Sequence, residues 1–159
     1  MLSNNISYFD ILDNQETPYS GFKGVLNSVP EREQRFNDLA EEAIIRIQNG
    51  FNVELSNTAN CISILESIIA VMWQEGWDPN NADVDLFATD FGSVLTRTIQ
   101  NLFYGRLVFR SDRDISHLSI WWPGYKIEVF PLHKVYKRLM KPIGESIEVY
   151  VNNISQKIK

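Results

Sequence analysis

The fold class is decided by residues 105–131, which read GRLVFRSDRDISHLSIWWPGYKIEVFP. Apolar and polar side chains alternate here with a period of two, which is typical of half-buried strands. The alternation occupies three runs, Arg106–Ser111, Ile115–Trp122 and Tyr125–Phe130. The connections at 111–114 and 123–124 are rich in turn-forming residues. Short turns between consecutive strands predict a three-stranded antiparallel meander.

Before these strands, apolar residues recur at helical spacing and predict three helices, at about 28–50, 57–75 and 83–104. Ser28, Pro30 and Glu31 form a capping box that begins the first helix, and Gly50 is expected to end it. Cys61, Ile64 and Val71 widen the apolar stripe of the second helix, which indicates a central helix.

The third predicted helix begins near Asp83 and is expected to end at Gly105. Gly92 lies inside it, where glycine costs about 1 kcal/mol relative to alanine, so a close packing contact is expected there. After the meander a helix begins near Leu132, is broken around 142–144 and continues to Ile158.

This order predicts an α+β protein in which three N-terminal helices, a three-stranded antiparallel meander and a C-terminal helical segment form one layer pair. The 159 residues are expected to fold as a single domain, 1–159. Residues 1–27 show no sustained period, so they are interpreted as an irregular arm whose aromatic side chains dock on the body.

Composition narrows the class of protein. Fifteen basic and twenty acidic residues give a net charge of −5, which argues against generic nucleic-acid binding. One cysteine permits neither an internal disulfide nor a cysteine-based zinc site. The sequence shows no secretion signal and no membrane-spanning run, so an acidic, soluble, cytoplasmic protein without membrane contact is expected.

Residues able to do chemistry are sparse. The glycines form no phosphate-binding cluster, and Cys61 lies among apolar neighbours, where a buried small hydrophobe is the simpler interpretation. His117 and His133 lie apart in the sequence, although they could meet in space beside a carboxylate. Residues 78–83 lack the central glycine and terminal glutamate of a calcium loop. The sequence therefore favours a protein with no catalytic site, no metal and no cofactor.

Basic residues gather on the C-terminal helix. Lys134, Arg138 and Lys141 recur at i, i+4 and i+7, with Lys137 adjacent. Two interpretations remain open. The face could be solvated and also pair with the acidic first helix, or it could contact an anionic partner.

The tryptophan pair Trp121-Trp122 is the other candidate for an interaction. Adjacent strand residues point to opposite faces, so one covered face cannot bury both indoles. One is expected in the core, and the other under the N-terminal arm or at an interface, where tryptophan is enriched. The predicted interaction residues are Trp121, Trp122, Tyr125, Lys134, Lys137, Arg138 and Lys141.

Three segments carry a resemblance to a known group: residues 90–95 (DFGSVL), residues 120–122 (IWW) and residues 130–138 (FPLHKVYKR). Together they resemble small bacterial α+β domains with a Phe-Gly helix, a Trp-bearing meander and a Pro-led C-terminal helix. Some members of that group are immunity-protein-like. The resemblance implies a small, acidic, non-catalytic protein and transfers no active-site residue.

The functional hypothesis is a bacterial protein-binding module, with the immunity-like role that the resemblance implies, and a homodimer through the same surface is the nearest competitor. The alternative is a small-molecule-binding protein or an enzyme, which needs a concave site lined by Trp121 or Trp122, Tyr125 and converging polar groups. A flat apolar patch would favour the first class, and an empty polar cleft the second.

Overall fold

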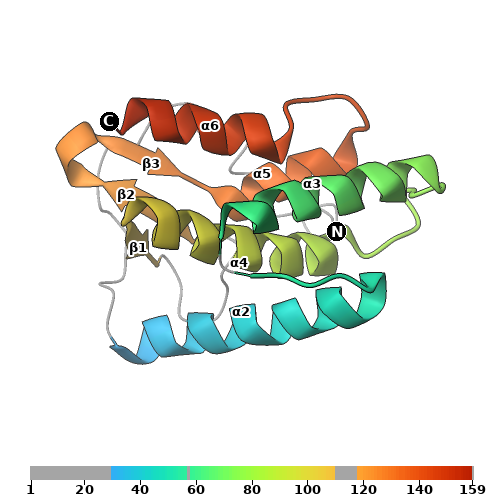
Figure 1. Cartoon of the computed structure of the whole chain (residues 1–159), viewed down its shortest axis with the longest axis horizontal. Coiled ribbons are helices and arrows are strands. Elements are labelled where there is room, and N and C mark those ends of the chain that lie inside the picture. The colour runs from blue at the N-terminus through green and yellow to red at the C-terminus, as the bar shows by residue number, and fades with distance from the viewer. Residues whose placement is uncertain (1–29, 57, 110–117, 159) are drawn as a thin grey trace, which may run out of the picture.

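The computed structural model describes residues 30–56, 58–109 and 118–158. Within them the chain is an α+β protein with five α-helices and a three-stranded antiparallel sheet. The elements in chain order are α2 (Pro30–Phe51), α3 (Ala59–Gln74), α4 (Val84–Phe103), β1 (Arg106–Val108), β2 (Ser119–Trp122), the 3-10 turn η2 (Pro123–Tyr125), β3 (Ile127–Val129), α5 (Pro131–Met140) and α6 (Ile147–Lys157). The helices lie roughly parallel to one another, with α2 and α6 on opposite sides (Figure 1).

The sheet has the order β1-β2-β3, which confirms the predicted meander. Its central strand pairs antiparallel with both neighbours, so that Ile120 lies opposite Leu107 on one side and Val129 on the other. The third strand is shorter than the alternating run that predicts it. Tyr125, expected in the third strand, lies instead in the turn η2, because the chain after Pro123 closes a 3-10 turn that ends with Lys126 at φ 54°. Residues 110–117, part of two predicted strands, lie outside the described residues.

The central helix is α4, which contacts α2, α3, α5 and β2. Residues 91–99 of α4 are buried without interruption, so no side of the helix reaches solvent over that length. The second helix, α3, which the sequence predicts to be a central helix, packs mainly on α4 and α6. The extra width of its apolar stripe does not reflect burial on all sides, because Val71 of α3 is 45% exposed.

Two glycines allow close packing. A Cβ on Gly92 would lie 2.7 Å from the Cα of Leu132 in α5, which confirms the close contact predicted at this position. Gly105 does not end α4 as predicted. The helix ends at Phe103, its C-cap Tyr104 adopts the left-handed conformation, and a Cβ on Gly105 would collide with Ile120 and Trp122. Gly105 is thus required by packing against β2.

The ends of the other helices follow local sequence signals. Pro30 is the first residue of α2, where its missing N–H costs nothing. Gly50 does not end that helix, because the left-handed residue is Asn52, at φ 53°. Residues 141–146 separate α5 from α6, as the proline and glycine there predict. Ser28 and the predicted arm at 1–27 lie outside the described residues.

Candidate functional site

Both members of the tryptophan pair are buried. Trp121 is 8% exposed and Trp122 is 6% exposed. Trp122 belongs to the continuous core, as expected for one of the two. Trp121 lies on the opposite face of the sheet, where Ser119 donates a hydrogen bond to the buried carboxylate of Glu128. All four residues of β2 are buried, so both faces of this strand are covered. The arm at 1–27, one of the two expected covers for the second indole, lies outside the described residues.

Three of the four tryptophans bond to the ends of helices. Trp73 and Trp77 donate their indole N–H groups to the carbonyls of Arg138 (3.1 Å) and Leu139 (2.8 Å), in the last turn of α5. Trp122 donates in the same way to Phe103, the last residue of α4, at 2.9 Å. Carbonyls in the last turn of a helix have no partner within the helix. These indoles therefore stabilise the fold. Among the aromatic residues of the predicted interaction set, Tyr125 is the one that is exposed to solvent.

The predicted basic face is divided. The ammonium of Lys134 lies 3.3 Å from the carboxylate of Glu145 and 5.6 Å from the ring centroid of Tyr150, and burial lowers its pKa. Arg138 is paired with Glu66, whereas Lys137 and Lys141 are exposed. The expected pairing with the first helix is wrong for Lys134 and Arg138, whose acidic partners come from the α5–α6 connection and from α3.

The pair Glu66–Arg138 ties three helices together. Each side chain is only 11% exposed, and the Nη2 and Nε atoms of Arg138 donate to Oε2 of Glu66 at 2.7 and 3.1 Å. The other carboxylate oxygen of Glu66 accepts the backbone N–H of Ile147, the first residue of α6, at 2.8 Å. One carboxylate of α3 thus holds both α5 and the start of α6, which assigns Arg138 to the interior rather than to a binding surface.

Cys61 and His133, two residues considered for chemistry in the sequence, lie in the described part of the chain. The thiol of Cys61 is fully buried, as predicted, and burial raises its pKa. His133 is buried on α5, and His117 lies outside the described residues. The carboxylate of Asp83 accepts the N–H of Leu86 and so caps α4. Residues 30–56, 58–109 and 118–158 contain no group of three or more His, Cys, Asp or Glu side chains positioned to hold a metal ion. None of the helices described is both long and apolar enough to cross a membrane.

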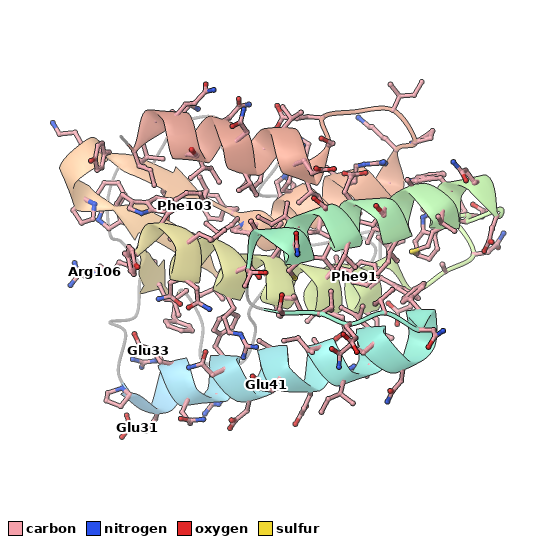
Figure 2. All side chains as sticks on the ribbon, viewed as in Figure 1. Glu31, Glu33, Glu41, Phe91, Phe103 and Arg106 are labelled. Carbon is pink, nitrogen blue, oxygen red and sulfur yellow. The ribbon has the colours of Figure 1, made fainter. Side chains whose placement is uncertain are left out.

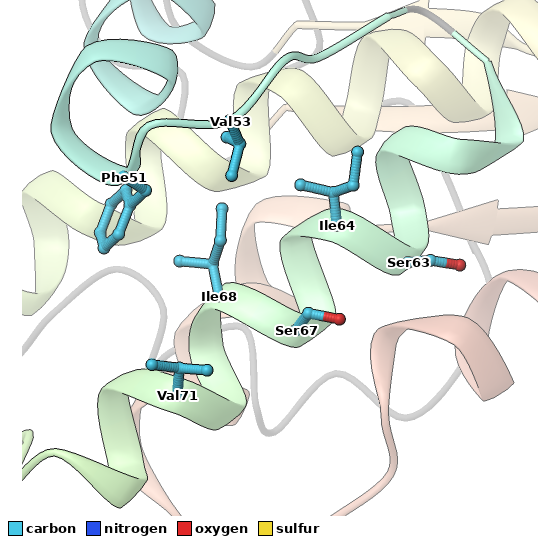
Figure 3. A pocket seen from close by; sticks show the side chains of 7 residues that line it. All are labelled: Phe51, Val53, Ser63, Ile64, Ser67, Ile68 and Val71. Carbon is cyan, nitrogen blue, oxygen red and sulfur yellow. The ribbon is translucent and has the colours of Figure 1, made fainter.

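An open, apolar groove of about 370 Å³ lies beside α3, and we call it the α3 groove. Phe51 and Val53 line one side of it, and Ser63, Ile64, Ser67, Ile68 and Val71 of α3 line the other. Ile64 and Ile68 point toward Val53, whereas the hydroxyls of Ser63 and Ser67 point away from it (Figure 3). The groove thus presents hydrocarbon to solvent and offers few groups for polar recognition.

A second, smaller groove lies on the other side of Phe51, between α2 and α4, with a volume of about 340 Å³. Phe51 forms a wall of both grooves and packs on Phe91 at a centroid distance of 5.9 Å. Arg46 and Asp90 border the second groove and form a two-point ion pair, with N···O distances of 2.7 and 2.9 Å. The two charges neutralise each other there.

The α3 groove was not predicted from the sequence, although the sequence contains residues that indicate it. Ile64 and Val71 widen the stripe of α3 beyond what its neighbours α4 and α6 cover. A wide apolar stripe predicts a central helix, but a helix that packs on only part of its surface shows the same excess of apolar residues. Of the predicted interaction residues, Trp121, Trp122, Lys134 and Arg138 are held within the fold, and none of the seven lines the groove.

Comparison with known proteins adds no relative to this geometry. No family model, no curated protein and no solved structure matches the chain, so the site is interpreted from its own residues.

Proposed function

We propose that this protein is a non-catalytic protein-binding module and that its partner docks in the α3 groove. The observation that carries the proposal is the groove itself, an open apolar surface bordered by Val71, which is 45% exposed. Exposed apolar surface concentrated in one groove is unfavourable for an isolated protein and typical of an interface.

The shape favours a protein over a small molecule. Small-molecule sites enclose most of the ligand and fix it with several converging polar groups. The α3 groove is open along its length, and its polar side chains are Ser63 and Ser67. Ser63 already donates to Glu148 at 3.2 Å. A small-molecule-binding protein or an enzyme remains the alternative, and an enclosed ligand in the groove would support it.

The proposal moves the binding surface from the hairpin and α5 to α3, since the groove exposes apolar side chains whereas both indoles of the pair are buried. The detailed arrangement of the fold and the biological role predicted from the sequence are proposed unchanged. We propose a single domain over residues 1–159, with the three N-terminal helices, the meander and the C-terminal segment in one layer pair. We also propose a bacterial, cytoplasmic, immunity-like role with a protein partner or a second copy, and without cofactor, nucleic acid or membrane contact.

The test is selection of a random peptide library displayed on phage against the immobilised protein, followed by binding measurements with the enriched peptides. Val71→Ser should weaken their binding about fivefold or more, since removing an apolar anchor at the centre of an interface costs more than 1 kcal/mol. Ile45→Ser is the matched control, because Ile45 is equally exposed but lies outside the groove, and it should leave affinity unchanged. Failure to enrich any peptide, or equal effects of the two variants, would refute the proposal.

A further inference from the structure

The charges around the α3 groove identify the chemistry of its occupant. Residues 47–96, which include most of the groove, contain seven acidic residues and no lysine or arginine. This absence of positive charge over fifty consecutive residues is unusual in a chain with fifteen basic residues. Glu66 and Asp90 are paired with Arg138 and Arg46 from outside the stretch, so the negative charge of this surface comes from the other carboxylates, Glu54 and Glu75 among them.

Three exposed carboxylates lie at the edges of the groove. Glu54 follows Val53 on the connecting segment. Glu75 lies one helical turn beyond Val71, and its N–H still donates to the carbonyl of Val71 at 2.9 Å. Glu148 of α6 accepts a hydrogen bond from Ser63 at the other end. Among the residues that the structure describes, none of these three carboxylates has a basic side chain within ion-pair distance.

The length of the groove fits a helical partner. The α3 side runs from Ser63 to Val71, a distance of about 12 Å at 1.5 Å per residue. Two turns of a partner helix cover about the same distance and place apolar side chains at i, i+4 and i+7 on one face. The polar flanks of such a helix would then lie above the carboxylates at the edges.

We infer that the occupant of the α3 groove is a cationic amphipathic helix of a partner protein, with apolar anchors in the groove and lysine or arginine beside Glu54, Glu75 and Glu148. This inference rests on the proposed function and gives its partner a chemical class. The chain's own residues 1–29 fit less well, because they carry three acidic residues and one basic residue. A second copy fits less well, because Lys134 and Arg138 of its α5 are already paired within the fold.

The experiment compares two fluorescent helical peptides of about 16 residues, long enough to be partly helical alone. Both carry leucine at the same i, i+4 and i+7 positions. They differ only at the charged positions, which hold lysine in one peptide and glutamate in the other. The full-length protein should bind the lysine peptide about tenfold more tightly than the glutamate peptide at low salt. The difference should shrink at about 0.5 M salt, where the Debye length is only about 4 Å.

Charge reversal locates the effect. Glu54→Lys should weaken binding of the lysine peptide about fivefold, in the range measured for exposed charge pairs. Glu31→Lys is the matched control, because Glu31 is exposed at the opposite end of α2 from the groove (Figure 2), and it should have no effect. Equal weakening by both variants would show non-specific attraction and would overturn the inference.

The outcomes separate this inference from the proposed function. If both peptides bind equally and Val71→Ser weakens both, the groove binds proteins but the inferred charge of the partner is wrong. If the lysine peptide binds and neither Val71→Ser nor Glu54→Lys changes its affinity, the groove is not the site and both proposals fail. Concentration-dependent dimerisation that Val71→Ser abolishes would assign the groove to a second copy and would overturn the inferred partner.

Discussion

The indole N–H of Trp122 donates to the backbone carbonyl of Phe103 at 2.9 Å and so joins the central strand to the end of α4. Phe103 is the last residue of its helix, and its carbonyl has no partner within the helix. The strand residue that most resembles a binding anchor in the sequence is therefore part of the structural core. This relationship is the reason for placing the binding surface elsewhere.

Trp122→Phe should lower the free energy of unfolding by about 1–3 kcal/mol, because the ring is largely kept while a buried carbonyl loses its donor. Urea unfolding measures the change, and binding of peptides selected on the wild-type protein should not change. Wild-type stability together with lost peptide binding would instead assign Trp122 to an interface.

Gly92→Ala should destabilise the protein by about 1–3 kcal/mol, despite the better helix propensity of alanine, because the new methyl group would lie 2.7 Å from the Cα of Leu132. Gly50→Ala is the control in α2. A Cβ there would meet no atom within 4 Å, so this variant should gain up to about 1 kcal/mol. Thermal or urea unfolding of the two variants should thus give shifts of opposite sign, and equal gains would disprove the close contact between α4 and α5.

Removing one partner of the Glu66–Arg138 pair should cost about 3–5 kcal/mol, because the other charge is left buried. Glu66→Leu should cost more than a surface variant such as Glu31→Lys, since Glu66 also accepts the N–H of Ile147. The double variant Glu66→Leu/Arg138→Met should recover much of the loss, as buried pairs replaced by apolar residues often do. Additive losses in urea unfolding would show that the two side chains do not act as a pair.

The thiol of Cys61 should be unreactive toward a disulfide reagent in the folded protein and react only on unfolding, because it is fully buried and burial raises its pKa above the ordinary 9.0. Because the pKa of the thiol is higher in the folded state, the stabilisation that the protonated thiol gives the folded state is complete below pH 9 and is lost as the pH rises above it. The free energy of unfolding of the wild type should therefore fall faster above pH 9 than that of Cys61→Ala, by up to about 1.4 kcal/mol per pH unit. Parallel pH profiles would contradict this assignment.

Much of the architecture could be predicted from local patterns. The change of period at Arg106 predicts the meander, and the start of α4 at Val84 follows from its N-cap Asp83, because these signals depend on neighbouring residues. The same local patterns place Tyr125 wrongly in the third strand, because they do not distinguish a 3-10 turn from the start of a strand.

Long-range relationships account for what could not be predicted. The spacing of Lys134 and Arg138 places both on one helix face, but the carboxylate that binds Arg138 lies 72 residues away. Alternation along β2 shows that Trp121 and Trp122 point to opposite faces and gives no information on whether the second face is covered. The width of the α3 stripe reports apolar area, and only the packing of its neighbours separates a buried side from an open groove.

The most direct test of the central claim, that partners bind at the α3 groove, is a titration of the protein with a selected peptide, followed by NMR of its isoleucine and valine methyl groups. The account predicts the largest shift changes at Val53, Ile64, Ile68 and Val71, with little change at Ile120 and Ile127 of the sheet. Large changes at Ile120 and Ile127 with none at Val71 would contradict the claim and return the binding surface to the hairpin.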